Sequence, residues 1–129
     1  RGHDGEVGLH VRAGRVDHPP ESYGMRLTSV SGRVLVYSGD TAYCDALVDL
    51  AAGADVLLCE ASWTHEEGRP PGIHMSGAEA GRTARRAGGG RLVVTHIPPW
   101  TDRERVRAEA AVGFSGEVLL AEPDLRIDV

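Results

Sequence analysis

The stretch LVYSGDTAYCDALVDLA, residues 35–51, decides the fold because it passes from a buried strand to a helix through one carboxylate. Gly39, Asp40 and Thr41 follow the apolar residues at its start, and the glycine predicts a turn that ends the strand there. Helical spacing follows at Cys44, Leu47, Val48 and Ala51. A strand that ends in a glycine turn and an acid is typical of an open α/β sheet, whose chemistry lies at the carboxyl ends of its strands.

The rest of the chain alternates strands with helices after an opening meander. Strands are predicted in residues 8–16, 23–30, 32–39, 54–60 and 91–96, and as two short closing strands within 117–129. Helices are predicted in residues 42–53, which should stop at Gly53, and in 76–90 and 101–113. Capping boxes are expected at Ser76 with Glu79 and at Thr101 with Glu104. This order predicts a mixed α/β sheet with helices on one face.

Composition limits the class of protein. The 129 residues suffice for one domain at most, and 41% hydrophobic with 26% charged residues is ordinary for a globular chain. A net charge of −5 argues against nonspecific capture of nucleic acid or of an anionic membrane. Cys44 and Cys59 have no metal-type spacing, and we find neither a leader nor an apolar membrane span, so we expect a cytoplasmic location.

Polar side chains gather at the predicted strand ends. His18 follows the first strand, Asp40 the third, Glu60 the fourth and His96 the next buried one, while His74 precedes helix 76–90. Taken singly, each has an ordinary interpretation as a turn residue, a helix-terminal charge or a solvated acid. Their shared position favours one site, and imidazoles with a carboxylate suit zinc or a similar divalent ion.

The chain resembles a known family in several motifs. DHPPESYGMRL, LVYSGDTAYCDALVDLA, ADVLLCEASW, HMSGAEAGRTARRAG and LVVTHIPPW resemble successive motifs in the second half of metallo-β-lactamase-fold hydrolases. Ribonuclease Z and its phosphodiesterase relatives form the most similar branch. Within it, CEASWTHEE and THIPPWTDRE are most similar to actinobacterial atypical cyclic-nucleotide phosphodiesterases. The resemblance runs from about Val11 to the C-terminus.

This resemblance implies a role for each strand-end residue. His18 matches a ligand of the first metal, Asp40 the aspartate that bridges both metals, and His96 a ligand of the second. His74 matches the histidine that contacts the scissile phosphate or protonates the leaving oxygen, and Glu60 the acid that orients it. Asp40, His74 and Glu60 are therefore the expected catalytic residues, around two Zn²⁺ ions in a complete site, with Mn²⁺ as the alternative ion.

One expected signature is absent. The family's His-x-His-x-Asp-His loop, which supplies four of the seven ligands, does not occur, and His3 with Asp4 does not fit it. His10 and His65 match no family role and are expected to face solvent. Residues 1–129 are therefore expected to be the C-terminal half of an αββα domain within a longer gene product. The missing N-terminal half, or a second copy of the chain, is the expected partner.

The spacing of two residues bears on the substrate. Ribonuclease Z enzymes carry a tRNA-gripping arm between the residues that match His18 and Asp40, whereas a simple hairpin fills this interval here. A small phosphodiester such as a cyclic nucleotide is therefore favoured over tRNA, and no membrane partner is expected. Three alternatives stay open: a tRNA 3′-processing endoribonuclease, an inactive half-domain fragment, and an unrelated α/β binding module.

Overall fold

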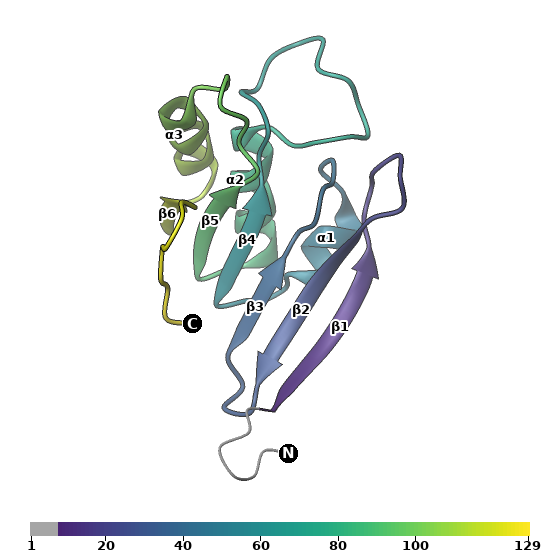
Figure 1. Ribbon diagram of the computed structural model, residues 1–129, viewed down its shortest axis with the longest axis vertical. Coiled ribbons are helices and arrows are strands. Elements are labelled where there is room, and N and C mark those ends of the chain that lie inside the picture. The colour runs from purple at the N-terminus through teal and green to yellow at the C-terminus, as the bar shows by residue number, and fades with distance from the viewer. Residues whose placement is uncertain (1–7) are drawn as a thin grey trace.

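Six strands form one mixed sheet whose spatial order follows the chain (Figure 1). The computed structural model describes residues 8–129, so His3 and Asp4 lie outside the described residues. The strands are β1 (Leu9–Arg15), β2 (Tyr23–Ser29), β3 (Val34–Tyr37), β4 (Val56–Glu60), β5 (Arg91–Thr95) and β6 (Glu117–Leu120). The first three pair antiparallel, and β3 to β6 pair parallel.

This pairing brings the carboxyl ends of five strands to one edge. Because β2 runs antiparallel to both of its neighbours, β1 points in the same direction as β3 to β6. In Figure 1 the arrows of β1, β3, β4 and β5 point toward the top of the molecule. The segments that carry His18, Asp40, Glu60 and His96 therefore emerge at the same edge, as the sequence predicted.

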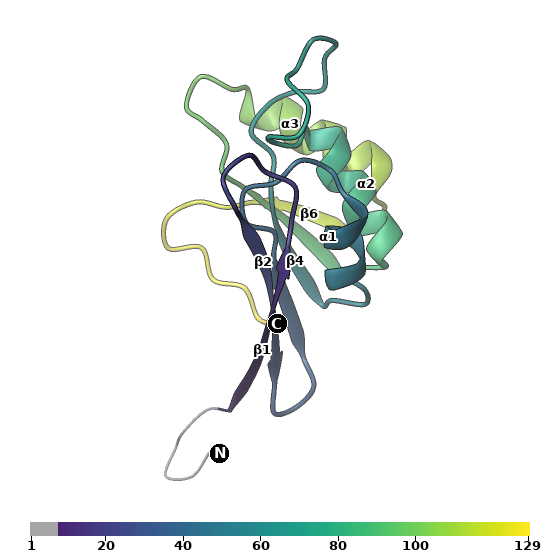
Figure 2. The same ribbon diagram turned by 90° about the vertical axis from the view of Figure 1, so that its right-hand side faces the viewer.

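Three helices cover one face of the sheet: α1 (Asp45–Leu50), α2 (Gly77–Ala87) and α3 (Arg103–Gly113) (Figure 2). Alternate strand residues such as Leu57 and Leu92 meet Leu47, Ala84 and Val106 from the helices, and all five are fully buried. Burying these side chains is the main favourable contribution to folding. The predicted mixed sheet with helices on one face is confirmed. None of the helices in residues 8–129 has the length and apolar character needed to cross a membrane.

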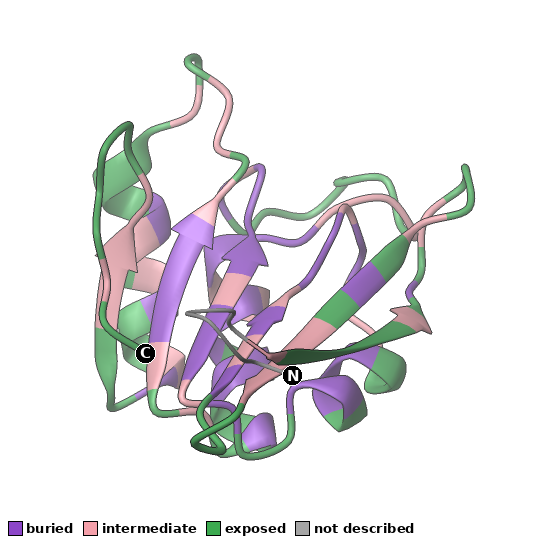
Figure 3. Cartoon of the chain, turned by 60° about the horizontal axis from the view of Figure 1, so that its bottom comes forward, coloured by how far each residue is buried: buried purple, intermediate pink, exposed green. Residues whose placement is uncertain are grey.

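The opposite face of the sheet is also apolar. The register of the strand pairs shows which side chains share this face, the one away from the helices: Leu27, Leu35, Leu58, Val93 and Leu119. Residues 121–129 run along this side (Figure 2), where the Arg91 guanidinium donates a hydrogen bond to the carbonyl of Asp128. Figure 3 shows that β4 and β5 are largely buried, whereas β1 is exposed along most of its length.

One of the two predicted helix caps is wrong. The Ser76 box is confirmed, with Glu79 N–H donating to Ser76 Oγ at 3.1 Å and Ser76 N–H to Glu79 Oε1 at 2.9 Å. At α3, however, Asp102 is the cap and accepts from Arg105 N–H at 3.1 Å. The Thr101 hydroxyl instead donates to the carbonyl of Ser62 at 3.0 Å. This hydrogen bond joins the loop after β5 to the segment after β4.

Two further predictions differ from the structure. Only one closing strand forms, β6, because Pro123 has no N–H for a ladder and the chain turns at Asp124, whose φ is 67°. The first helix ends at Leu50, earlier than predicted. Gly53 lies beyond it at φ 68° and donates its N–H to Ala87 O at 2.8 Å, which joins this turn to the end of α2.

The contact between α2 and α3 requires a residue without a side chain. A Cβ added to Gly81 would lie 2.3 Å from the carbonyl oxygen of Ala110, a backbone atom that no rotamer change can move. By contrast, a Cβ at Gly113 would come no closer than 3.5 Å, to Arg82 N, which is ordinary contact.

Gly81→Ala should lower the free energy of unfolding by about 1–3 kcal/mol, because forcing the helices apart outweighs the roughly 1 kcal/mol gain in helix propensity. Gly113→Ala, the matched control, should be neutral or slightly stabilising. Urea denaturation followed by circular dichroism measures both. Equal stability of the two variants would contradict this account of the packing.

Candidate metal centre

The carboxylate of Glu60, at the end of β4, is fully buried and accepts four hydrogen bonds. Oε1 accepts from Thr41 N–H at 2.9 Å and His74 Nδ1–H at 2.7 Å. Oε2 accepts from Met75 N–H and the Ser62 hydroxyl, each at 3.1 Å. Four donors match the four acceptor positions of a carboxylate. The Glu60 side chain ties together the ends of β3 and β4 and the loop before α2.

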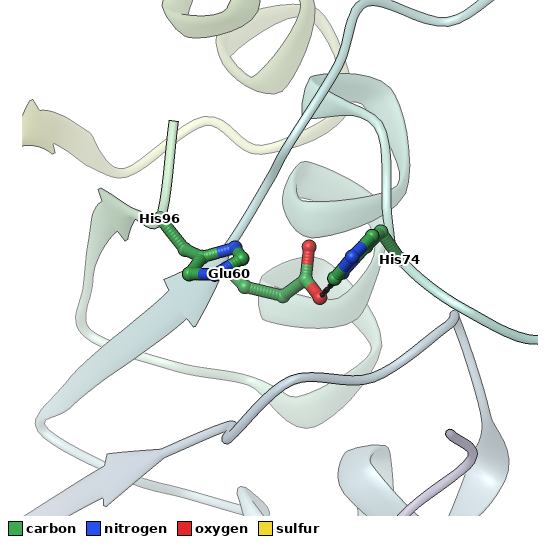
Figure 4. Close-up of side chains that lie close together, drawn as sticks. All are labelled: Glu60, His74 and His96. Carbon is green, nitrogen blue, oxygen red and sulfur yellow. Dashed lines mark hydrogen bonds and ion pairs between the residues drawn. The ribbon is translucent and has the colours of Figure 1, made fainter. Parts of the chain in front are cut away.

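Three histidine rings lie in a row beside this carboxylate. The ring centroids of His18 and His74 are 5.5 Å apart, and those of His74 and His96 are 5.3 Å apart. Figure 4 shows His74 turned toward Glu60, with His96 on the other side of the carboxylate. His18 comes from the β1–β2 turn, His74 from the loop before α2 and His96 from the end of β5. The structure therefore brings these predicted site residues together.

Each imidazole is oriented by a hydrogen bond at Nδ1. The acceptors are Pro20 O at 3.2 Å for His18, Glu60 Oε1 at 2.7 Å for His74 and Ser62 Oγ at 2.9 Å for His96. Because the Ser62 hydroxyl donates its proton to Glu60 Oε2, its oxygen is left to accept from Nδ1–H of His96. With Nδ1 protonated, every neutral ring carries its free lone pair on Nε2, the tautomer in which Nε2 binds metal.

Asp40 is presented to His96 by a turn that requires glycine. Gly39 has φ 65°, and a Cβ there would lie 2.5 Å from Tyr23 O, so only glycine fits. Ser22 Oγ donates to the Asp40 carbonyl at 2.8 Å and fixes the next peptide. Asp40 Oδ1 then lies 3.6 Å from His96 Nε2. His96 itself has φ 60°, a conformation that costs about 1–3 kcal/mol in a residue with a side chain and is common at functional sites.

These donors fit a zinc-type ion. One ligand atom each from Glu60, His74 and His96 lies within 4.8 Å of the others, a spacing at which one ion could contact all three. The four hydrogen bonds to Glu60 already occupy its oxygens, so we assign it to orientation of the histidines. The available donors are then the Nε2 atoms and the Asp40 carboxylate, of the types that zinc prefers.

Neighbouring titratable groups do not compete for this role. Burial, followed by the charge of Glu60, raises the pKa of the Cys59 thiol, which stays protonated at neutral pH. Its side chain lies in the core beneath the helices. Burial, followed by the charge of Asp40, raises the pKa of the Tyr37 phenol, so it too stays neutral.

The remaining histidines lie outside the cluster. His10 is exposed in β1, and His65 is exposed as predicted. His65 nevertheless holds its loop, because its N–H donates to Glu109 at 2.9 Å and its Nδ1 lies 2.8 Å from Ser76 Oγ.

Sequence reasoning missed Ser62 and Thr41. Thr41 accepts from Asp17 N–H at 3.0 Å through Oγ1, in addition to donating its own N–H to Glu60, so it connects the His18 turn to the buried carboxylate. Ser62 joins Glu60 to His96. The available signal was a hydroxyl residue next to Asp40 and another two residues after Glu60, which is too common a pattern to single out.

Comparison with known proteins places the chain in a family. A family model described as the β-lactamase superfamily domain matches residues 3–97. The chain belongs to this superfamily. An uncharacterised protein of Mycobacterium leprae is 62% identical over 103 residues, which cover 80% of this chain and 36% of that protein. Ribonuclease Z of Thermobifida fusca is 40% identical over 103 residues, covering 76% of this chain and 32% of that enzyme.

The superfamily fold is supported by a solved structure as well. YhfI of Bacillus subtilis, described as a probable metallo-hydrolase, is 37% identical over 105 residues, covering 81% of this chain and 43% of YhfI. The crystal structure of YhfI, a metallo-β-lactamase fold protein, superposes with a TM-score of 0.82 and 30% identity over 94% of this chain and 52% of that chain. The chain thus spans about half or less of the length of these superfamily relatives.

Glu60→Gln should destabilise the protein by roughly 2–6 kcal/mol. Whichever oxygen becomes the amide, two buried donors then face an NH₂ group, and each lost acceptor costs about 1–3 kcal/mol. The exposed Glu67→Gln, the matched control, should stay within about 0.5 kcal/mol of the parent. Denaturant unfolding measures both, and a Glu60→Gln protein as stable as the control would refute the role of Glu60 as a structural anchor.

Proposed function

We propose that this chain contributes part of the active site of a metal-dependent phosphodiesterase that acts on cyclic nucleotides. His18, Asp40 and His96 would hold metal, with Asp40 between two ions, and Zn²⁺ is the ion that these donors suit best. His74 and Glu60 would serve the chemistry beside them. The supporting observation is the row of three imidazoles, each fixed through Nδ1 with Nε2 free, next to the Asp40 carboxylate.

The residues divide the work according to their contacts. A divalent ion held by these residues would supply Lewis acidity toward water and the phosphodiester. Displacement at phosphorus leaves an alkoxide that needs a proton, and His74 can donate it from Nε2 when its ring is doubly protonated. The neutral ring left behind keeps its Nδ1 proton in the 2.7 Å hydrogen bond to Glu60. Glu60 would therefore hold the His74 ring in the same orientation before and after the proton transfer.

A second polypeptide segment is part of this proposal. One carboxylate and two imidazoles leave two metal ions short of ligands, and the relatives are about twice as long as this chain or longer. We propose that an N-terminal αβ half supplies the remaining ligands and packs on the apolar sheet face formed by partly exposed residues such as Leu27, Leu35 and Leu58. A second copy of the chain is the alternative partner.

Processing of tRNA 3′ ends is the second candidate, favoured by the 40% identity to ribonuclease Z of Thermobifida fusca. Against it, residues 19–39 form only a turn, β2, a tight turn and β3, without the inserted arm expected in such enzymes. The net charge of −5 also disfavours a large polyanion. An inactive half-domain that binds a partner is the remaining alternative.

The 129-residue chain by itself should retain less than about one zinc per chain after dialysis, because an incomplete ligand set binds weakly. It should not hydrolyse bis(p-nitrophenyl) phosphate. Atomic absorption and a p-nitrophenol assay measure the two properties. Stoichiometric zinc with chelator-sensitive turnover would show that the chain completes its site without an N-terminal half, and size-exclusion chromatography would then test for a dimer.

In the longer protein, His74→Ala should keep its metal but lose about 10²–10⁴-fold in turnover of a cyclic nucleotide, the usual worth of a general acid. The loss should be much smaller for bis(p-nitrophenyl) phosphate, whose leaving group needs little protonation. Asp40→Ala, the comparison variant, should lose both metal and turnover. Equal losses of the His74 variant on both substrates would exclude the acid role.

A further inference from the structure

A cavity of about 770 Å³ opens directly beside the histidine row. His74 and His96 form one part of its wall, and Trp63, Arg69, Trp100 and Arg105 form much of the rest. This volume falls in the range of small-molecule sites, roughly 300–1,000 Å³. A substrate whose reacting group lies at His74 and His96 would therefore extend into this cavity.

The indole of Trp100 is the most unusual feature of the cavity, because it is 84% exposed. It lies on the loop that follows β5, next to two consecutive prolines that restrict the backbone. Thr101 holds this loop through Oγ1 to Ser62 O and through N–H to Pro98 O, each at 3.0 Å. An aromatic ring on a constrained loop loses little conformational entropy when it stacks on a ligand.

Trp63 is a second, already fixed indole in the same cavity. It meets the ring of His74 edge-on, with centroids 5.5 Å apart at 82°. The guanidinium of Arg69 lies over it, 5.4 Å from the ring centroid. Arg69 is in turn held by hydrogen bonds to Thr64 Oγ1 at 3.0 Å and Glu66 Oε2 at 2.9 Å. Trp63 thus forms a rigid aromatic wall, whereas Trp100 is free to receive a partner.

The charges around the cavity balance. Arg69 and Arg105 are matched by Glu66 and Asp102, which also line it. Grooves that bind single-stranded nucleic acid are positively charged along the backbone path, and this one is not. The lining instead suits a planar, largely uncharged group attached to a single phosphate.

We propose that Trp100 determines specificity by stacking on the nucleobase of a mononucleotide whose phosphate lies at His74 and His96. This inference rests on the proposed function and extends it, because it assigns the cavity to the base and predicts selection for nucleotides over other phosphodiesters. Stacking on an aromatic side chain tolerates any base, so Trp100 selects for the presence of a base.

The test compares two unreactive probes on the longer protein: adenosine 5′-monophosphate, and ribose 5-phosphate, which lacks the base. Isothermal titration calorimetry gives the ratio of their affinities. Trp100→Ala should reduce the preference for the nucleotide roughly 5–150-fold, the usual worth of one stacked base. Trp100→Phe should retain most of it. Val30→Ala, which shortens an apolar side chain that is 83% exposed in the β2–β3 turn, should retain all of it.

The outcomes separate this inference from the proposed function. A wild-type protein that binds both probes equally overturns the stacking role, whatever its turnover. An unchanged preference in Trp100→Ala, combined with lower thermal stability, overturns it too and shows that another segment covers the indole. A preference lost in Trp100→Ala supports the inference even if no phosphodiester is hydrolysed, an outcome that would reject the phosphodiesterase proposal alone.

Discussion

The buried carboxylate of Glu60 organises the site end of this molecule. A fully buried charge is costly to desolvate, and here four hydrogen bonds offset that cost. Its donors come from the segment after β3, the segment after β4 and the loop before α2, which are far apart in sequence. No other group in the described residues accepts hydrogen bonds from all three of these segments. The loops at the sheet edge are therefore fixed in relation to one another by one side chain.

This anchor explains how loop residues can form an ordered centre. Thr41 is hydrogen-bonded to both Glu60 and Asp17, the residue before His18. Ser62 is likewise hydrogen-bonded to both Glu60 and His96. Histidines on loops would otherwise sample many orientations, and fixing Nδ1 determines both the direction of the ring and the nitrogen left free. The left-handed backbone of His96 is sustained in the same way, because its ring and its carbonyl both contact Ser62.

The two faces of the sheet have different surroundings. One face is buried by α1, α2 and α3, where close approach at Gly81 brings two helices together. The other carries apolar residues on β2 to β6, with residues 121–129 running along it. The proposed N-terminal half would bury this second face. Through the same interface it would also supply the remaining metal ligands. Fold completion and metal binding would then be linked, since the same contact serves both.

The sequence by itself determined the order of elements, the helix-covered mixed sheet and the gathering of His18, Asp40, Glu60, His74 and His96. These follow from local rules, because apolar periodicity and glycine or proline breaks mark the strands, and similarly directed strands end at the same edge. Only the tertiary structure decided the hydrogen bonds that give these residues their orientation. Ser62, Thr41 and the cap at Asp102 depend on which loops meet in space, and the cavity beside Trp100 arises between loops remote in sequence. A contact between two distant segments produces no periodic pattern in the sequence of either segment. The local sequence patterns therefore could not reveal these contacts.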